Sequence, residues 1–133
     1  MSAPEMLQPE GLGKPVGMYS HASRVGDLLF VAGQLAVDAE GNVVGPGDFE
    51  AQMRQVFRNL GSALAGGGTS FGGVAKLTTY LTRADDVEGF YRVRSELFAE
   101  LYPEGGYPPN TLLVVDRLVF PECLIEIEAV AAV

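Results

Sequence analysis

The chain has 133 residues, a formal net charge of −8, 47% hydrophobic residues and 20% charged residues. This length and balance are typical of one globular domain that buries a core of its own. The lysines and arginines are scattered along an acidic chain. Because nucleic acid is bound through a basic patch, we expect no nucleic-acid partner.

The sequence also bears on where the protein acts. It has no apolar stretch of about 18 residues, which a membrane-spanning helix would need. The first residues lack the basic and apolar segments of a secretion signal. The single cysteine, Cys123, has no partner for an internal disulfide. We therefore expect a cytoplasmic protein that does not interact with a membrane.

The N-terminal part of the chain predicts an arm followed by a β-hairpin. Residues 1–16 are rich in proline and glycine and show no periodicity, so we interpret them as a surface arm before a single domain over residues 17–133. A strand is expected from Tyr19 to Val25, and Gly26-Asp27 suits a two-residue type II′ turn. The returning strand, residues 28–32, is apolar on both faces, so both faces should be covered.

Two helices are expected farther along the chain. The first is capped by Asp48 and ends at the glycines of 66–68. The second begins at Asp85, which forms a capping box with Glu88, and its apolar stripe includes the position of Arg94. In the first helix the apolar stripe is formed by Phe49, Met53, Val56, Phe57, Leu60 and Leu64, and Gln52 and Asn59 lie mainly off it. In the second helix it is formed by Val87, Phe90, Tyr91, Leu97, Phe98 and Leu101.

Three further strands complete the predicted fold, over Val74–Leu81, Thr111–Val115 and Leu124–Val130. The last strand alternates Glu126 and Glu128 on one face with apolar residues on the other. Two helices on one face of a mixed sheet make an α+β architecture. Because two strands are apolar on both faces, the other face needs a cover, and another copy of the chain is the simplest source. We therefore expect an oligomer.

Four kinds of polar residue could carry chemistry. Arg94 either extends past the apolar stripe into water or contacts an anionic or polar ligand. Glu126 and Glu128 either form a solvated face or, if a partner covers them, include a carboxyl with a raised pKa that could position water or move protons. His21 is the only histidine and has no neighbours with metal-ligand spacing, so we predict a structural role and no metal. Cys123 lacks a basic neighbour, so we do not expect a catalytic thiol.

Several ordered blocks of the sequence resemble one known family. They are Gly17–Ala22, Arg24–Gln34, Gln52–Leu60, Val74–Tyr80 and Leu124–Ala131. Together they resemble the RidA family, which is also called the YjgF or reactive-intermediate deaminase family and includes proteins named endoribonuclease L-PSP. The resemblance extends over about residues 15–133, and the common order of the blocks makes it specific.

The resemblance implies a fold, an assembly and an activity. The fold is the chorismate-mutase-like α+β fold, assembled as a homotrimer in which the sheets form a central barrel and three clefts lie at the subunit interfaces. Family members hydrolyse reactive enamines and imines formed from amino acids: water attacks the imine carbon, ammonia leaves, and no cofactor is needed. Older family names mention ribonuclease activity, but the acidic charge and the lone histidine argue against RNA as a substrate here.

Part of the family's cleft is retained in this chain. Tyr19 corresponds to a tyrosine that lines the cleft. Gly33 and the following glutamine match a Gly-Gln pair, although Ala32 stands where the family has a serine. Glu126 matches the glutamate that contacts the attacking water or the ligand. The resemblance therefore implies that Glu126 is catalytic and that Tyr19, Ala32 and Gly33 contact the substrate.

Three further cleft positions differ from the family. Arg94 stands in place of an asparagine, Leu112 in place of a cysteine, and Asn110 in place of the arginine that binds the substrate carboxylate in deaminating members. Asparagine cannot supply the charge of an arginine–carboxylate pair. The usual 2-imino acid is therefore not the expected substrate, unless Arg94 restores the charge from the opposite wall.

Two hypotheses about function remain. The first is an enzyme that hydrolyses a small imine, enamine or related metabolite, in which Glu126 orients water, Asn110 and the region of Gly33 supply polar contacts and Tyr19 shapes the cleft. The alternative is a non-catalytic trimer that binds a small molecule or a protein in the same clefts. The retained Tyr19 and Glu126 favour the enzyme, whereas the changed positions favour the binding module.

Overall fold

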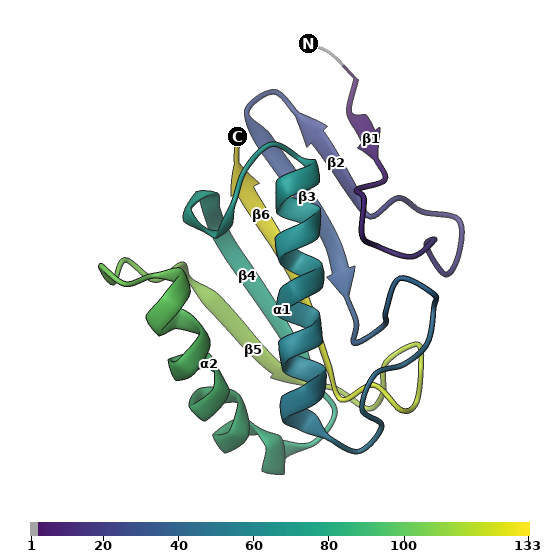
Figure 1. Cartoon of the computed structure of the whole chain (residues 1–133), viewed down its shortest axis with the longest axis vertical. Helices are drawn as coiled ribbons and strands as arrows, with labels where there is room; N and C mark the ends of the chain where they lie inside the picture. The colour runs from purple at the N-terminus through teal and green to yellow at the C-terminus, as the bar shows by residue number, and fades with distance from the viewer. Residues whose placement is uncertain (1–2) are drawn as a thin grey trace.

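The computed structural model describes residues 3–133 and has two layers (Figure 1). Six strands form one mixed sheet in the order β1-β2-β3-β6-β4-β5, and helices α1 and α2 both lie on the same face of it (Figure 1). Only β4 and β5 pair in parallel. This arrangement confirms the predicted α+β class. The elements are β1 (Glu5–Leu7), β2 (Ala22–Val25), β3 (Leu28–Gln34), α1 (Phe49–Gly66), β4 (Val74–Leu81), α2 (Val87–Leu101), β5 (Asn110–Val114) and β6 (Ile125–Ala132).

The predicted N-terminal arm of residues 1–16 contains a short strand that its sequence does not indicate. Glu5–Leu7 forms β1 and pairs with β2 at the edge of the sheet. Three residues are too few to show the alternation by which a strand is predicted, so the pairing with β2 decides the structure here. Residues 1–2 lie outside the described part of the chain.

The β2–β3 hairpin is confirmed, although β2 begins at Ala22 and not at Tyr19. Gly26 has a φ of +56°, whereas Asp27 does not have a positive φ. A type II′ turn has this pattern, because only its first central residue needs the left-handed region. The turn pairs Val25 with Leu28 and sets the register of both strands.

A β-bulge interrupts β3 near its end. Val31 pairs with Ala129 of β6, and the register then shifts before the next pair, which Gln34 makes. Ala32 and Gly33 therefore both stand opposite the single residue between these partners on β6. A bulge of this kind changes the direction in which the following side chains point. As a result, Val31 and Gln34 are both buried although they are three positions apart.

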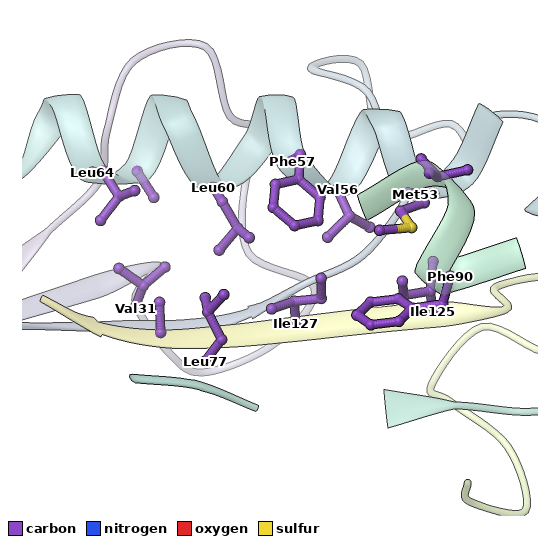
Figure 2. Close-up of a cluster of buried hydrophobic side chains, with 14 of the residues drawn as sticks. Val31, Met53, Val56, Phe57, Leu60, Leu64, Leu77, Phe90, Ile125 and Ile127 are labelled. Atoms are coloured by element: carbon purple, nitrogen blue, oxygen red, sulfur yellow. The ribbon is translucent and has the colours of Figure 1, made fainter. Parts of the chain in front are cut away.

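Helix α1 carries the core, as predicted. Its first turn is capped by Asp48, whose carboxylate accepts a hydrogen bond of 3.0 Å from the backbone N–H of Ala51. It ends at Gly66, Gly67 is its C-cap, and the next residue, Gly68, has a φ of +90°. Figure 2 shows its apolar side chains facing the sheet, where the core includes Val31, Met53, Val56, Phe57, Leu60, Leu64, Leu77, Phe90, Ile125 and Ile127.

The start of α2 differs from the prediction. A 3₁₀ turn over Ala84–Asp86 precedes the helix, and the N-cap residue Asp86 makes no side-chain capping bond. The predicted capping box of Asp85 and Glu88 is therefore wrong. The carboxylate of Asp86 instead accepts two hydrogen bonds from Arg83, at 2.7 and 3.0 Å. An ion pair with a neighbouring arginine thus takes the place of the cap.

The buried face of α2 is also rotated relative to the predicted stripe. Phe90, Val93 and Phe98 are buried, whereas Tyr91 is half-exposed. Tyr91 was wrongly placed on the buried stripe, and Val93 was omitted from it. Arg94 consequently lies at the edge of the buried face, beside Tyr91, and is partly exposed.

The two faces of the sheet have different surroundings. On β6, Ile125 and Ile127 point into the core under the helices, while Glu126 and Glu128 point to the opposite face. On that open face Phe30 of β3 remains 43% exposed. The prediction that both faces of β3 are covered is therefore not met within a single chain. In the described residues, no helix combines the length and the apolar character needed to cross a membrane.

Candidate active site

Glu126 lies across the backbone of Gly33. A Cβ atom on residue 33 would be 2.5 Å from Oε2 of Glu126 and 2.7 Å from its carboxyl carbon. No side chain fits at such distances, so the carboxyl can occupy this position only because residue 33 is a glycine. Gly33 does not have a positive φ, so space for Glu126, and not backbone strain, is what requires glycine here.

Glu126 lines a cavity of about 340 Å³. The cavity is also lined by Tyr19, Ala32 and Gly33, so the structure brings together four of the residues that the resemblance assigned to one cleft. Among residues 3–133, Glu126 contributes the only carboxyl to its walls. A mostly apolar hollow with one carboxyl suits a small ligand. The remaining wall residues are Val16, Gly17, Leu35 and Val119.

The surroundings of Glu126 favour its neutral form. Burial raises the pKa of its carboxyl above the usual range of a glutamate, and the negative charge of Glu128 raises that pKa further. Glu128 accepts a hydrogen bond from the hydroxyl of Tyr80, and this bond raises the pKa of Tyr80. Its raised pKa makes Glu126 a better proton acceptor than an ordinary glutamate, which suits a group that takes up and releases protons.

The wall that carries Tyr19 is held by His21. Nε2 of His21 lies 2.7 Å from the backbone oxygen of Gly13, and the buried amide of Gln34 lies 3.3 Å from Nδ1. Because the carbonyl of Gly13 can only accept, His21 carries its proton on Nε2 and accepts from Gln34 on Nδ1. The Tyr19 ring packs edge-on against the His21 ring, and its hydroxyl accepts a hydrogen bond from the N–H of Val16. These bonds give His21 the predicted structural role.

Two buried amides on α1 bind backbone groups of segments that carry cavity residues, namely Leu35 itself and the residues just before Glu126. Gln52 donates to the backbone oxygen of Glu122 at 2.8 Å and accepts from the N–H of Leu124 at 2.7 Å. Asn59 donates to the backbone oxygen of Leu35 at 2.9 Å. Both amides are buried, so the prediction that they lie off the buried stripe is wrong. Their polarity suggested the solvent face, and only their backbone partners reveal their role.

Asn110 and Leu112 do not reach the Glu126 cavity in the same chain. Asn110 accepts a hydrogen bond of 2.8 Å from the buried hydroxyl of Thr79. Leu112 pairs with Thr79 and packs against the main core. Both side chains therefore point to the helix side of the sheet, whereas Glu126 points to the other side. Only a contact between two copies of the chain could bring them to one ligand.

Arg94 lines a separate cavity of about 370 Å³, between α2 and the loop before β5. Its guanidinium lies 5.1 Å from the ring centre of Phe90 and 5.0 Å from that of Tyr91. Within one chain, Arg94 thus belongs to neither the Glu126 cavity nor the surroundings of Asn110. The predicted site residues are distributed over three separate places.

The remaining candidates offer little chemistry. Cys123 is fully buried, and burial raises the pKa of its thiol to about 11. A thiol that stays protonated at neutral pH is a weak nucleophile. In residues 3–133, no three or more histidine, cysteine, aspartate or glutamate side chains gather where a metal ion could bind.

Comparison with known proteins shows the family. The family model described as endoribonuclease L-PSP matches residues 12–133. A RutC family protein of Pyrococcus abyssi is 36% identical to this chain, over 97% of this chain and 97% of its own length. The crystal structure of the YjgF gene product of Escherichia coli superposes with a TM-score of 0.86 and 26% identity, covering 96% of this chain and 98% of that one. The chain belongs to the RidA (YjgF) family.

A second solved structure of the RidA type is E. coli TdcF with bound serine. It has a TM-score of 0.87 and 25% identity, and covers 97% of this chain and 98% of its own. The matched region of the family begins at residue 12, inside the predicted arm of residues 1–16. The RidA-like part of the chain therefore includes Val16 and Gly17, which line the Glu126 cavity, and Gly13, which binds His21.

Proposed function

We propose that this chain is a cofactor-free hydrolase of a small reactive imine or enamine, and that it acts in clefts between the subunits of a homotrimer. One observation carries the proposal: the Glu126 carboxyl is partly buried and held over Gly33, inside a cavity that Tyr19 also lines. A water molecule beside this carboxyl would be oriented toward a substrate that fills the rest of the cavity.

The chemistry needs only proton transfers. As the water oxygen forms a bond to the imine carbon, Glu126 accepts a proton from the water and passes it to the imine nitrogen, which gives a carbinolamine. The carbinolamine hydroxyl then loses its proton through the same carboxylate, the C–N bond breaks, and the nitrogen leaves as ammonia with that proton. A carboxyl with a raised pKa serves both directions of transfer, because its acid and base forms are closer in free energy at neutral pH.

The proposed position of the cleft between subunits has two supports. The open sheet face exposes Phe30 and Leu28, which a second copy would cover. In addition, Asn110 and Leu112 are on the opposite side of the sheet from Glu126, so the two halves of the family's cleft can meet only across such a contact.

The substrate is proposed to differ from the small 2-imino acid that is usual in the family. The arginine expected at position 110 is replaced by Asn110, whose side-chain oxygen already accepts a hydrogen bond from Thr79. An uncharged amide in this position cannot form a bidentate pair with a carboxylate. A substrate held only through position 110 would therefore bind weakly.

A second candidate function is a trimer that binds a small molecule or a partner protein without catalysis. The engaged Asn110 favours it, and so does the related TdcF structure, which contains serine. A ribonuclease is not proposed, because the chain has a net charge of −8 and a single histidine, His21, that is bonded to Gly13 and Gln34.

The two functions are separated by measuring turnover. A panel of 2-imino acids is generated in situ by an amino acid oxidase, and release of the 2-oxo acid is followed with and without the protein. We expect acceleration with at least one imine, and a loss of about 10²-fold or more in Glu126→Gln. Glu100→Gln, at an exposed position of α2, is the matched control.

Asn110→Arg is the complementary variant. It should gain hydrolysis of 2-aminoacrylate, provided that its melting temperature shows a folded protein. No acceleration with any imine, together with measurable binding of a small molecule, would favour the binding module. Turnover that survives Glu126→Gln would exclude Glu126 as the catalytic carboxyl.

A further inference from the structure

Arg94 differs from every other arginine of the chain in its bonding. The six others each donate to a carboxylate, an amide oxygen or a backbone oxygen. In residues 3–133, Arg94 forms no ion pair and donates no hydrogen bond. Because the chain has a net charge of −8, acidic side chains outnumber basic ones, and an arginine without an acidic partner is unusual. The fold itself does not require Arg94 to be unpaired.

The guanidinium is nevertheless held in place. It lies over the rings of Phe90 and Tyr91, at 5.1 and 5.0 Å from their centres. Stacking on an aromatic ring orients a guanidinium while its N–H groups at the edge remain free. Arg94 is therefore a positioned donor of several hydrogen bonds, and no residue among those described uses them.

The cavity beside Arg94 has walls that suit a flat, apolar molecule. Phe98 and Tyr107 stack on each other with ring centres 5.8 Å apart and an angle of 25° between the rings. Ala99 and Pro108 add apolar surface, and no acidic residue lines the cavity of about 370 Å³. Ser95 contributes the only other polar side chain apart from the Tyr107 hydroxyl, and its own hydroxyl donates to the backbone oxygen of Tyr91.

We propose that this Arg94 cavity binds a small carboxylate with a planar, unsaturated or aromatic body. The carboxylate would form a bidentate pair with Arg94, and the planar body would lie against Tyr107 and Phe98. The ligand must be anionic because the cavity has one unpaired positive charge and no negative one. An apolar body is also needed, because an ion pair exposed to water contributes little to binding by itself. Contact with the aromatic wall would supply the remaining affinity.

Carboxylate binding at Arg94 also indicates a substrate class for the proposed hydrolase. This second step rests on the proposed function, whereas the binding itself does not. Pro108 at the rim of the cavity is followed closely by Asn110, the position at which the carboxylate-binding arginine is missing. A cleft between two copies could therefore receive the substrate carboxylate at Arg94. The substrates would then be imines of aromatic amino acids, and not the smallest 2-imino acid.

Equilibrium binding tests the cavity without catalysis. Trans-cinnamate and its uncharged analogue cinnamamide are titrated into the native protein by calorimetry at pH 7. We expect cinnamate to bind at least tenfold more tightly than cinnamamide. Arg94→Gln should weaken cinnamate binding at least tenfold, Arg94→Lys should weaken it less, and Arg58→Gln, at an exposed arginine of α1, should leave it unchanged. In NMR spectra, the largest shifts should occur at Ser95 and Tyr107.

Two results would overturn the proposal: equal affinity for the acid and the amide, or unchanged cinnamate binding in Arg94→Gln. The proposal would also be overturned if cinnamate did not bind the native protein. This includes the outcome in which a second copy of the chain occupies the cavity and excludes cinnamate. The same titration of Glu126→Gln keeps the two ideas apart, because cinnamate should still bind. If cinnamate binds through Arg94 while no imine is hydrolysed, the proposed function fails and the carboxylate site remains.

Discussion

Gly33 and Glu126 occupy positions that depend on each other. A Cβ atom on residue 33 would be only 2.5 Å from Oε2 of Glu126, and Gly33 lies in the bulge of β3. A catalytic carboxyl must be held within a fraction of an ångström of its working position. The absence of a side chain at residue 33 is therefore part of the geometry of the candidate site.

The first prediction is that Gly33→Ala displaces Glu126 and reduces activity. The added methyl group would force the carboxyl out of its position, while the backbone at residue 33 can accept an alanine because its φ is not positive. We expect kcat/KM for the best imine substrate to fall by about 10²-fold, with the melting temperature little changed.

Gly72→Ala is the control for that variant. A Cβ atom on residue 72 would meet only the hydroxyl of Ser70, at 3.7 Å, and Gly72 is exposed and does not have a positive φ. This variant should retain full activity. If Gly33→Ala retained it as well, the position of the carboxyl over residue 33 would be irrelevant to turnover.

The second prediction concerns pH. Glu126 must be ionised to accept a proton from water, so kcat/KM should fall as the pH decreases through its raised pKa. The negative charge of Glu128 contributes to that elevation, so Glu128→Gln should shift the acid limb of the pH profile to lower pH. Activity on the plateau above this limb should change by less than about tenfold, because Glu128 is not assigned a proton-transfer role.

The pH profile is measured as kcat/KM between pH 4 and 9 for the native protein and for Glu128→Gln. Tyr80→Phe is a useful second variant, because it removes the hydrogen bond to Glu128 and leaves both carboxyls in place. An acid limb that stays fixed in Glu128→Gln would show that the two carboxyls do not interact as the structure indicates.

The third prediction concerns stability. Gln52 has no exposed surface, and its amide satisfies the N–H of Leu124 and the backbone oxygen of Glu122. Gln52→Leu would keep the apolar contacts, leave the buried N–H of Leu124 without a partner, and remove the hydrogen bond to the partly buried backbone oxygen of Glu122. We expect the free energy of unfolding to fall by about 2–4 kcal/mol.

Urea denaturation at one fixed protein concentration measures this loss, because the stability of an oligomer depends on concentration. Arg58→Ala, at an exposed position of the same helix, should change the free energy of unfolding by less than about 0.5 kcal/mol. If the free energy of unfolding of Gln52→Leu also fell by less than about 0.5 kcal/mol, water would have replaced the amide as the partner of these backbone groups.

Periodicity and turn chemistry were sufficient for most of the fold. The spacing of apolar residues placed α1, and Asp48 and the glycines of 66–68 marked its ends. The type II′ turn at Gly26 and the alternation in β6 also followed from residue types alone. These features are local, because each depends on residues within a few positions of one another.

Several features that sequence reasoning missed depend on contacts between distant segments, whereas the orientation of α2 depends on its own residues. Strand β1 exists because it pairs with β2, and its three residues show no pattern of their own. The burial of Gln52 and Asn59 depends on backbone groups far away in the sequence. The neighbouring Phe90 and Val93 fix the rotation of α2, which leaves Tyr91 outside.

The candidate site could be predicted only in part. Resemblance to the family pointed to Tyr19, Ala32, Gly33 and Glu126, and the structure places all four around one cavity. Their roles in binding and catalysis stay predictions. The orientation of Asn110 toward Thr79 could not be read from the sequence, because it depends on which face of a short edge strand meets the helices.

The fourth prediction concerns assembly. On the open face of the sheet, Phe30 is 43% exposed and lies in register with Val130 on the neighbouring strand β6. A large exposed aromatic residue on the outer face of a sheet is stabilised when a second copy covers it. The native protein should therefore sediment as a trimer at micromolar concentration, and Phe30→Asp should sediment as a monomer because a buried carboxylate without a partner opposes the contact.

The same variant links assembly to function. Because Glu126 and Asn110 can share a ligand only between copies, the monomeric Phe30→Asp should lose imine hydrolysis while its circular dichroism spectrum stays native-like. Val119→Asp makes a comparable change at an exposed apolar residue that lines the Glu126 cavity and lies outside the strands of the sheet. This variant should remain a trimer, so a loss of activity in it would come from the cavity and not from assembly. A native protein that sediments as a stable monomer and still hydrolyses imines would show that one chain supplies the whole site, and the opposed positions of Glu126 and Asn110 would then have no bearing on catalysis.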